Sequence, residues 1–116
     1  MKLHEIAAAL QAQTVTWGPE ADGADITAGY VSDLLSDVLA NAPQGAVLVT
    51  VQSHLNVVAV AVHAELAAVI FAAGRMPDEA TVERARQERM SLLISPMNAF
   101  EIVGRLYQLG VRGNQT

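Results

Sequence analysis

The sequence predicts a single α/β domain: a parallel, or mostly parallel, sheet of about five strands with helices on both faces. Short apolar runs rich in β-branched residues alternate with helix-length segments, which is the pattern of βαβ units. Two of these runs, within residues 26–37 and 46–56, end in polar residues before a helix begins. Strand-to-helix turns of this kind gather at the carboxyl ends of parallel strands, where α/β proteins bind ligands. Residues 1–110 are expected to make up this domain and residues 111–116 a flexible tail.

The amino-terminal part is predicted to contain a helix and two strands. Residues 3–12 carry apolar side chains at helical spacing, which predicts a short amphipathic helix. Residues 14–17 are β-branched and aromatic, which predicts a strand that the turn Gly18-Pro19 ends. An acidic loop that contains glycine follows, and residues 26–31 form the second predicted strand.

A helix, a buried strand and a second helix are predicted next. Ser32 is a plausible N-cap, so a helix is expected over residues 33–42, ending before Pro43. The apolar run 46–51 predicts a buried strand. The segment 55–65 is rich in valine and by propensity would suit a strand. Its length and its position between two better strands favour a crossover helix.

The carboxyl-terminal part completes the pattern with two strands and two helices. Strands are expected over residues 67–72 and 91–94. The helix over 78–89 has acidic residues at its start and arginines at its end, which offset its dipole. A closing helix is expected over 98–109. Its inward-facing residues are Ala99, Ile102, Val103 and Leu106.

The composition favours self-association and disfavours nucleic acid as a partner. Hydrophobic residues make up 52% of the chain and charged residues only 16%, so a small monomer would leave apolar surface exposed. We therefore expect a homodimer or a higher oligomer whose contact uses the leucines and valines of residues 31–42. The net charge is −5, and only Arg84, Arg86 and Arg89 form a basic cluster, whereas nucleic-acid binding needs clustered Lys and Arg.

The sequence also disfavours several locations and kinds of chemistry. The absence of cysteine excludes disulfides and thiolate sites. The first residues lack the apolar segment of a signal peptide, and no apolar run reaches the roughly 18 residues of a membrane helix. P-loop, dinucleotide-binding and serine-hydrolase motifs are absent, and the histidines are dispersed. We therefore predict a cytoplasmic protein without membrane partner, enzyme activity, catalytic residues, metal or cofactor.

Two aspartates, Asp33 and Asp37, stand four residues apart on one face of a predicted helix. Like charges so placed repel each other, which invites a metal or a basic partner. The simpler interpretation is that Ser32 and Asp33 satisfy free N–H groups at the helix start while Asp37 is solvated. We favour this simpler interpretation because such capping is common.

The turn after the strand 46–51 is a candidate binding site. Its polar side chains provide donors and acceptors at a predicted helix start, which suits an anion or another polar ligand. The alternative is an exposed turn with Ser53 as an ordinary cap. Because parallel strands end at one edge of a sheet, we expect a shallow pocket shared with the neighbouring turns. The predicted ligand-binding residues are Gly29, Tyr30, Ser32, Asp33, Gln52, Ser53, His54, Asn56 and Gly74.

The segments 49–57 and 68–79 resemble the DRTGG domain, and the likeness extends over most of the chain. That family is named for an Asp-Arg pair after one strand and a Thr-Gly-Gly run after the next. Here Ser53-His54 stand at the position of the pair and Ala72-Ala73-Gly74 at that of the run, where only the last glycine is retained. Residues 29–37 are similar to the stand-alone, single-domain branch of the family.

The resemblance implies an α/β fold like that of the N-terminal domain of HPr kinase, without the P-loop domain that performs the kinase reaction. Related domains are regulatory or dimer-forming units attached to phosphotransacetylases and to pyrophosphatases with CBS modules. The implied function is a non-catalytic regulatory module, a homodimer that binds a small anionic metabolite or nucleotide, a partner protein, or both. The alternatives are a pure interaction or scaffold domain and a metal-assisted hydrolase or transferase that uses His54 with Asp33 or Asp37.

Overall fold

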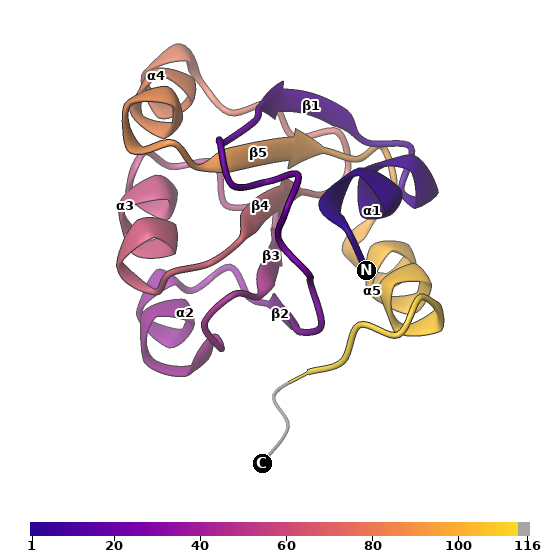
Figure 1. Cartoon of the computed structure of the whole chain (residues 1–116). Coiled ribbons are helices and arrows are strands. Elements are labelled where there is room, and N and C mark those ends of the chain that lie inside the picture. The colour runs from indigo at the N-terminus through magenta and orange to yellow at the C-terminus, as the bar shows by residue number, and fades with distance from the viewer. Residues whose placement is uncertain (114–116) are drawn as a thin grey trace.

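The computed structural model describes residues 1–113, in which five helices and five strands alternate largely as predicted (Figure 1). The helices are α1 Leu3–Ala9, α2 Leu35–Asn41, α3 Asn56–His63, α4 Glu79–Glu88 and α5 Ala99–Gln108. The strands are β1 Gln13–Thr16, β2 Gly29–Val31, β3 Val47–Thr50, β4 Ala68–Phe71 and β5 Ser91–Ile94. The valine-rich segment at 55–65 is a helix, as its length predicted.

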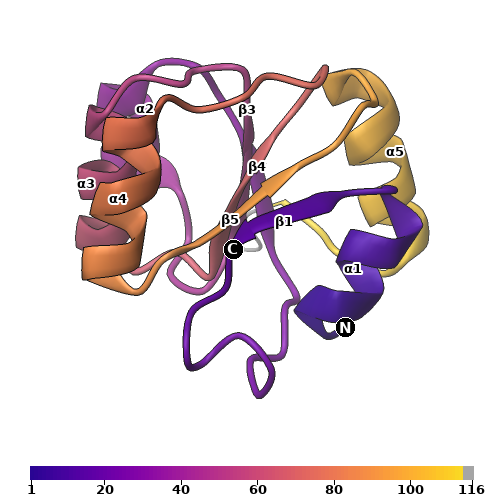
Figure 2. The same cartoon turned by 90° about the horizontal axis from the view of Figure 1, so that it is seen from above.

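The five strands form one sheet in the order β1-β5-β4-β3-β2, in which β2 to β5 are parallel and β1 is antiparallel to β5. Helices α2, α3 and α4 connect consecutive parallel strands and cover one face, and α1 and α5 cover the other (Figure 2). The three crossovers step across the sheet in the same direction, so their shared handedness places α2, α3 and α4 on the same face. This confirms the predicted α/β fold.

Strand β2 is shorter than the predicted strand over 26–31 because the residues before it pair elsewhere. The backbone N–H of Ile26 donates to Met1 O at 2.8 Å, and Lys2 and Asp25 form an isolated bridge. The start of the chain therefore holds these residues away from the sheet. Only the last three residues of the predicted strand pair with β3.

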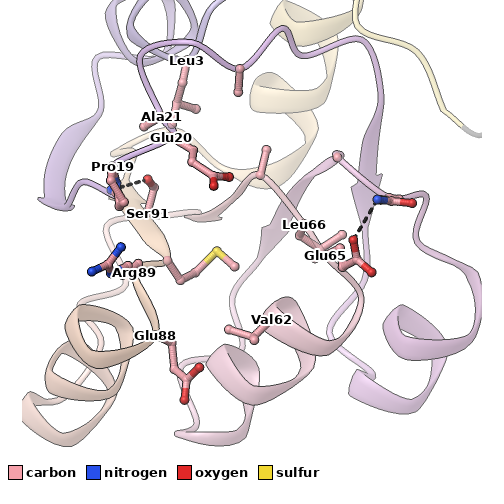
Figure 3. Close-up of a pocket in the computed structure, with 16 residues that line it drawn as sticks. Leu3, Pro19, Glu20, Ala21, Val62, Glu65, Leu66, Glu88, Arg89 and Ser91 are labelled. Atoms are coloured by element: carbon pink, nitrogen blue, oxygen red, sulfur yellow. Dashed lines mark hydrogen bonds between the residues drawn. The ribbon is translucent and has the colours of Figure 1, made fainter.

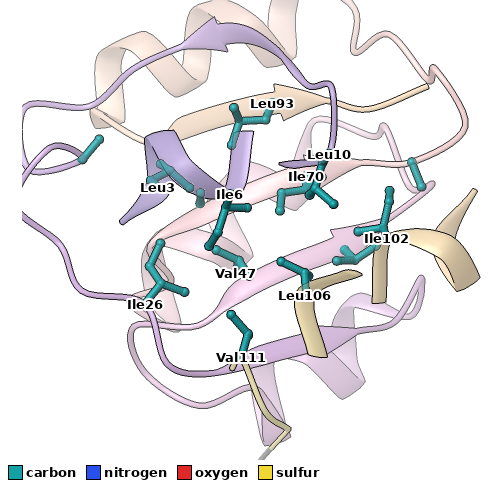
Figure 4. Close-up of a cluster of buried hydrophobic side chains, with 14 residues drawn as sticks. Leu3, Ile6, Leu10, Ile26, Val47, Ile70, Leu93, Ile102, Leu106 and Val111 are labelled. Atoms are coloured by element: carbon teal, nitrogen blue, oxygen red, sulfur yellow. The ribbon is translucent and has the colours of Figure 1, made fainter. Parts of the chain in front are cut away.

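Two apolar cores fill the space between the sheet and its two helical layers. In β4, Ala68 and Ile70 belong to the core under α1 and α5 (Figure 4), whereas Val69 and Phe71 belong to the core under α2, α3 and α4. Successive side chains of a strand point to opposite faces, so a strand covered on both faces is apolar throughout. Phe71 is the largest of the fully buried side chains.

Four helices end at a residue in the left-handed conformation, which lets the backbone turn back onto the last helical turn. These residues are Gln11, Glu65, Arg89 and Gly110. After α5, Val111 is buried, and the backbone N–H of Arg112 donates to Thr27 O at 3.0 Å beside β2. Residues 111–113 of the predicted tail thus lie beside β2, the outer strand of the sheet. Residues 114–116 lie outside the described residues.

Candidate functional site

The strands β2 to β5 end at one edge of the sheet, which we call the carboxyl edge, and α2 to α5 begin there. Hydrogen bonds join neighbouring turns at this edge. Asp33 Oδ1 accepts from Thr50 Oγ1 at 2.8 Å and from Val51 N at 2.9 Å, which joins the turns after β2 and β3. Thr81 Oγ1 donates to Ser53 O at 3.4 Å, which joins the turn after β3 to α4. The turns therefore lie side by side.

Asp33 does not cap α2. The N-cap position is occupied by Leu34, whose side chain makes no cap hydrogen bond, and Ser32 Oγ accepts from Leu34 N at 3.2 Å. The predicted capping by Ser32 and Asp33 is therefore wrong. One carboxylate oxygen of Asp33 instead accepts two hydrogen bonds from the end of β3 and the turn that follows it.

Asp37 lies in a small hydrogen-bond network and is not the solvated carboxylate that the sequence predicted. Asp37 Oδ1 accepts from Asn41 Nδ2 at 2.9 Å and from the Tyr30 hydroxyl at 2.8 Å. These donors, first Asn41 and then Tyr30 and Ser32, hold the pKa of Asp37 below its usual value. The same contact raises the pKa of Tyr30. The Tyr30 hydroxyl therefore serves the packing of α2 against β2.

His54 organises the turn after β3. Its Nδ1 accepts a hydrogen bond from Asn56 N at 3.1 Å, and Gln52 Oε1 accepts from His54 N at 3.1 Å. A ring nitrogen that accepts a hydrogen bond carries no proton, so Nε2 is the nitrogen of His54 that can donate. His54, rather than Ser53, thus satisfies a free N–H group at the start of α3. Its Nε2–H is left as a donor for a ligand.

The glycine and tyrosine candidates of β2 lie apart from this turn. Gly29 opens β2 beside Val47, and a Cβ there would lie 3.2 Å from Val111 Cγ1. The close approach of Val111 explains a glycine at this position. Gly74, by contrast, lies at the carboxyl edge with φ +68, and its backbone N donates to Ser95 O at 2.8 Å. Gly74 therefore shapes the turn after β4.

In the turns after β3 and β4, three side chains with hydrogen-bond donors make no hydrogen bond or ion pair within the part of the chain that the structure describes. They are Ser53, Asn56 and Arg75. Arg75 is absent from the residues that the sequence predicted, although it directly follows the turn at Gly74. Its position after a predicted strand end and a glycine could have identified it, because such a side chain extends from the same edge as the other turns.

Asp78 is the N-cap of α4 and faces the same edge. Its Oδ1 accepts from Thr81 N at 2.8 Å. The backbone N–H and then the hydroxyl of Thr81 lower the pKa of Asp78, and the nearby His54 contributes in the same direction. The carboxylate form of Asp78 is therefore the one that the fold stabilises.

Lowering the pH from about 6 to about 3 is expected to reduce the free energy of unfolding partly through Asp37 and Asp78. Both pKa values are depressed in the folded chain, so the stabilisation is complete above the unfolded pKa and is lost as the pH falls through the folded one. Asp78→Asn keeps an N-cap side chain but cannot titrate. The melting temperature of Asp78→Asn should therefore fall less steeply with pH than that of the wild type. An unchanged slope would show that this carboxylate does not contribute.

The third functional hypothesis, a metal-assisted hydrolase, finds no support in the residues proposed for it. His54 is hydrogen-bonded to neither Asp33 nor Asp37, whose carboxylates are held by other donors. Between residues 1 and 113, no three His, Asp or Glu side chains lie close enough together to hold a metal ion. In that same range, no helix has the length and apolar character needed to cross a membrane.

Comparison with known proteins finds a likeness in fold but none in sequence. No family model matches the sequence, and no curated protein matches it either. The structure is similar to the CBS and DRTGG domains of the regulatory region of Clostridium perfringens pyrophosphatase, solved with its activator, diadenosine tetraphosphate. The TM-score is 0.74 at 14% identity, over 92% of this chain and 46% of that one. The chain thus shares a fold with part of that region and spans less than half its length.

Proposed function

We propose that this chain is a non-catalytic regulatory module that senses a small anionic metabolite or nucleotide at its carboxyl edge. The observation that carries the proposal is the group of free donors there: His54 Nε2–H, Ser53, Asn56 and Arg75. The starts of α3 and α4 add partial positive charge to the same edge. The similarity in fold to a regulatory region solved with a nucleotide activator supports a sensing role.

Two carboxylates at this edge are already engaged within the chain. Asp33 accepts two hydrogen bonds from the turn after β3, and Asp78 caps α4. Their negative charges are therefore partly offset by donors of the protein itself. An anionic ligand is expected between His54 and Arg75, where the side-chain donors have no partner in the chain.

ATP is expected to raise the melting temperature, because a ligand that binds only the folded state stabilises it. His54→Ala and Arg75→Ala should each weaken ATP binding about tenfold, since each removes a hydrogen bond to a charged ligand. Arg84→Ala is the matched control, because Arg84 loses the same charge but is paired with Glu88 along α4. Two results would contradict a site at this edge. One is equal weakening of ATP binding by all three substitutions, and the other is a melting temperature that neither ATP nor inorganic phosphate changes.

The homodimer is part of the same proposal, and the exposed apolar side chains beside β2 support it. Val31, Leu34 and Leu39, in the region predicted for the contact, are 51%, 64% and 46% exposed. On the other side of β2, α5 presents an exposed stripe of Phe100, Val103 and Tyr107. Val103 was predicted to face inward, but it lines a groove of about 140 Å³ shared with Val31 and Tyr107. Exposed apolar surface of this kind is typical of interfaces.

Leu34→Glu is expected to convert the dimer to a monomer, because the substitution places two copies of a charge in a two-fold contact. Met76→Glu is a suitable control, since Met76 is 62% exposed but follows β4 rather than β2. Sedimentation velocity at micromolar concentration measures both. A wild-type chain that stays monomeric, or a dimer that tolerates Leu34→Glu, would rule out this interface.

A pure interaction or scaffold domain is the second candidate, and the apolar stripe on α5 favours it. Phe100 is 86% exposed on this helix, more than any other large apolar side chain of the described residues. A scaffold would use such surface without any ligand at the carboxyl edge. The thermal-shift experiment with ATP therefore separates the two functions, because only the regulatory module gains stability from the nucleotide.

A further inference from the structure

A cleft of about 500 Å³ lies at the opposite edge of the sheet, the amino edge, where β3, β4 and β5 begin (Figure 3). It is bounded by the loop after β1 and by the turns that precede these three strands. Its volume is in the range of small-molecule sites. The sequence did not predict a site here, and the proposed anion site lies at the other edge.

The floor of the cleft is apolar and its rim is acidic. Leu3, Leu66 and Met90 are buried floor residues. The charged residues that line the cleft are Glu20, Glu65, Glu88 and Arg89. Glu88 is paired with Arg84, so two unpaired carboxylates face one guanidinium, which leaves an excess of negative charge. The cleft therefore suits a ligand that has both apolar and cationic parts.

Two of the carboxylates are available to a ligand and lie on opposite sides of the cleft. Glu20 extends from the loop after β1, and Glu65 from the turn between α3 and β4 (Figure 3). Glu65 Oε2 accepts from Gln44 Nε2 at 2.8 Å, a neutral donor that leaves its charge uncompensated. Glu20 has no ion pair within residues 1–113, whereas Glu88 is paired with Arg84 at 3.3 Å.

The helices reinforce this negative potential. Helices α2 and α3 run from the carboxyl edge to the amino edge, so their carbonyl ends point toward the cleft, whereas Arg86 and Arg89 offset the dipole at the end of α4. Each carbonyl end carries a partial negative charge. The same fold therefore presents partial positive charge at one edge and partial negative charge at the other. This polarity favours a cation in the cleft. It disfavours binding in the cleft of the kind of anion that is proposed for the carboxyl edge.

We infer that the cleft binds an aliphatic di- or polyamine. Ammonium groups would pair with Glu20 and Glu65 while the methylene chain between them packs on Leu66 and Met90. A metal ion fits less well, since no three carboxylate or imidazole groups of the described residues lie close enough together to ligate one. The apolar floor would also leave a hydrated cation poorly solvated. This site is independent of the proposed anion site, from which it differs in position and in charge.

Isothermal titration calorimetry with spermidine tests the inference. Glu20→Gln and Glu65→Gln should each weaken spermidine binding about tenfold, because each removes one charged hydrogen bond. Glu101→Gln is the matched control: it removes the same charge from an exposed position on α5, away from the cleft. Binding by Glu101→Gln should equal that of the wild type. Both cleft carboxylates are exposed, so far-UV circular dichroism should show all three variants folded.

Two results would overturn the polyamine site. Equal weakening by Glu101→Gln, or displacement of spermidine by an equal charge of Mg²⁺, would show a diffuse attraction to a chain of net charge −5. Amide shifts in the wild-type chain provide a readout that needs no variant. Spermidine should move the resonances of residues 18–24, 65–67 and 88–91, and shifts confined to other residues would exclude the cleft.

Discussion

Replacing Gly18 with alanine is expected to lower the free energy of unfolding by about 3 kcal/mol, because the new methyl group has no room. A Cβ at Gly18 would lie 2.3 Å from Arg89 O and 3.3 Å from Arg89 C. Both atoms belong to the backbone at the end of α4, so no side-chain rotation relieves the clash. Gly18 N also donates to the buried Ser91 Oγ at 2.9 Å, and displacing the loop would break that bond. Urea denaturation of the purified chain measures the loss.

Gly23→Ala is the control for this prediction. Gly23 lies in the same loop, and a Cβ there would meet nothing within 4 Å. Gly→Ala at a position that accepts the new residue stabilises slightly, because it restricts the unfolded chain. If the two substitutions change stability equally, the close approach of the loop to α4 does not exist in solution. The amino-edge cleft would then lose one of its walls.

Phe71→Ala is expected to cost about 4 kcal/mol of unfolding free energy, since it removes a large buried ring and leaves a cavity. Phe71 is fully buried at the end of β4, between Thr50 of β3 and Ile94 of β5. The chain offers a matched control in Phe100→Ala, which removes the same atoms from a side chain that is 86% exposed. The control should change monomer stability by less than about 0.5 kcal/mol. Comparable losses at the two positions would contradict the predicted arrangement of core and surface.

The sequence predicted the elements well because their causes are local. Residues 91–94 form a strand as expected, and the valine-rich segment 55–65 contains a helix, as its length and its place between two strands predicted. Parallel pairing of β2 to β5 follows from those connections. The shortening of β2 could not be predicted, because it depends on contact with Met1, far away in the sequence.

That the turns after β2, β3 and β4 lie together was predictable, but their contacts were not, and Gly29 and Tyr30 lie apart from the turn at His54. The turns that were expected to meet do lie along one edge, since parallel strands share their direction. The role of Asp33 depends on Thr50 and Val51, which are distant in the sequence, so local spacing suggested a helix cap instead. The alternative interpretation placed Ser53 as the cap of α3, but His54 Nδ1 is the group that accepts from Asn56 N, and the spacing of the two residues does not distinguish them.

The amino-edge cleft gave no signal in the sequence. It is assembled from turns that are distant along the chain and that meet only when the sheet forms. None of these turns contains a motif, and the polar turns within the segments that resemble the DRTGG domain lie at the carboxyl edge. Glu20 and Glu65 individually look like solvated surface residues. Only their positions on opposite sides of an apolar floor suggest a ligand.

The central claim is that the carboxyl edge binds an anionic ligand, and a nuclear magnetic resonance titration of the wild-type chain with ATP tests it most directly. The amides of residues 52–56 and 74–76 should shift in a saturable manner, because they surround the donors of His54 and Arg75. Of the two ring nitrogens of His54, Nε2 should show the larger change in chemical shift, because Nδ1 already accepts a hydrogen bond from Asn56 N. No saturable shift at these residues at millimolar ATP, or shifts confined to the amino edge, would contradict the proposed function.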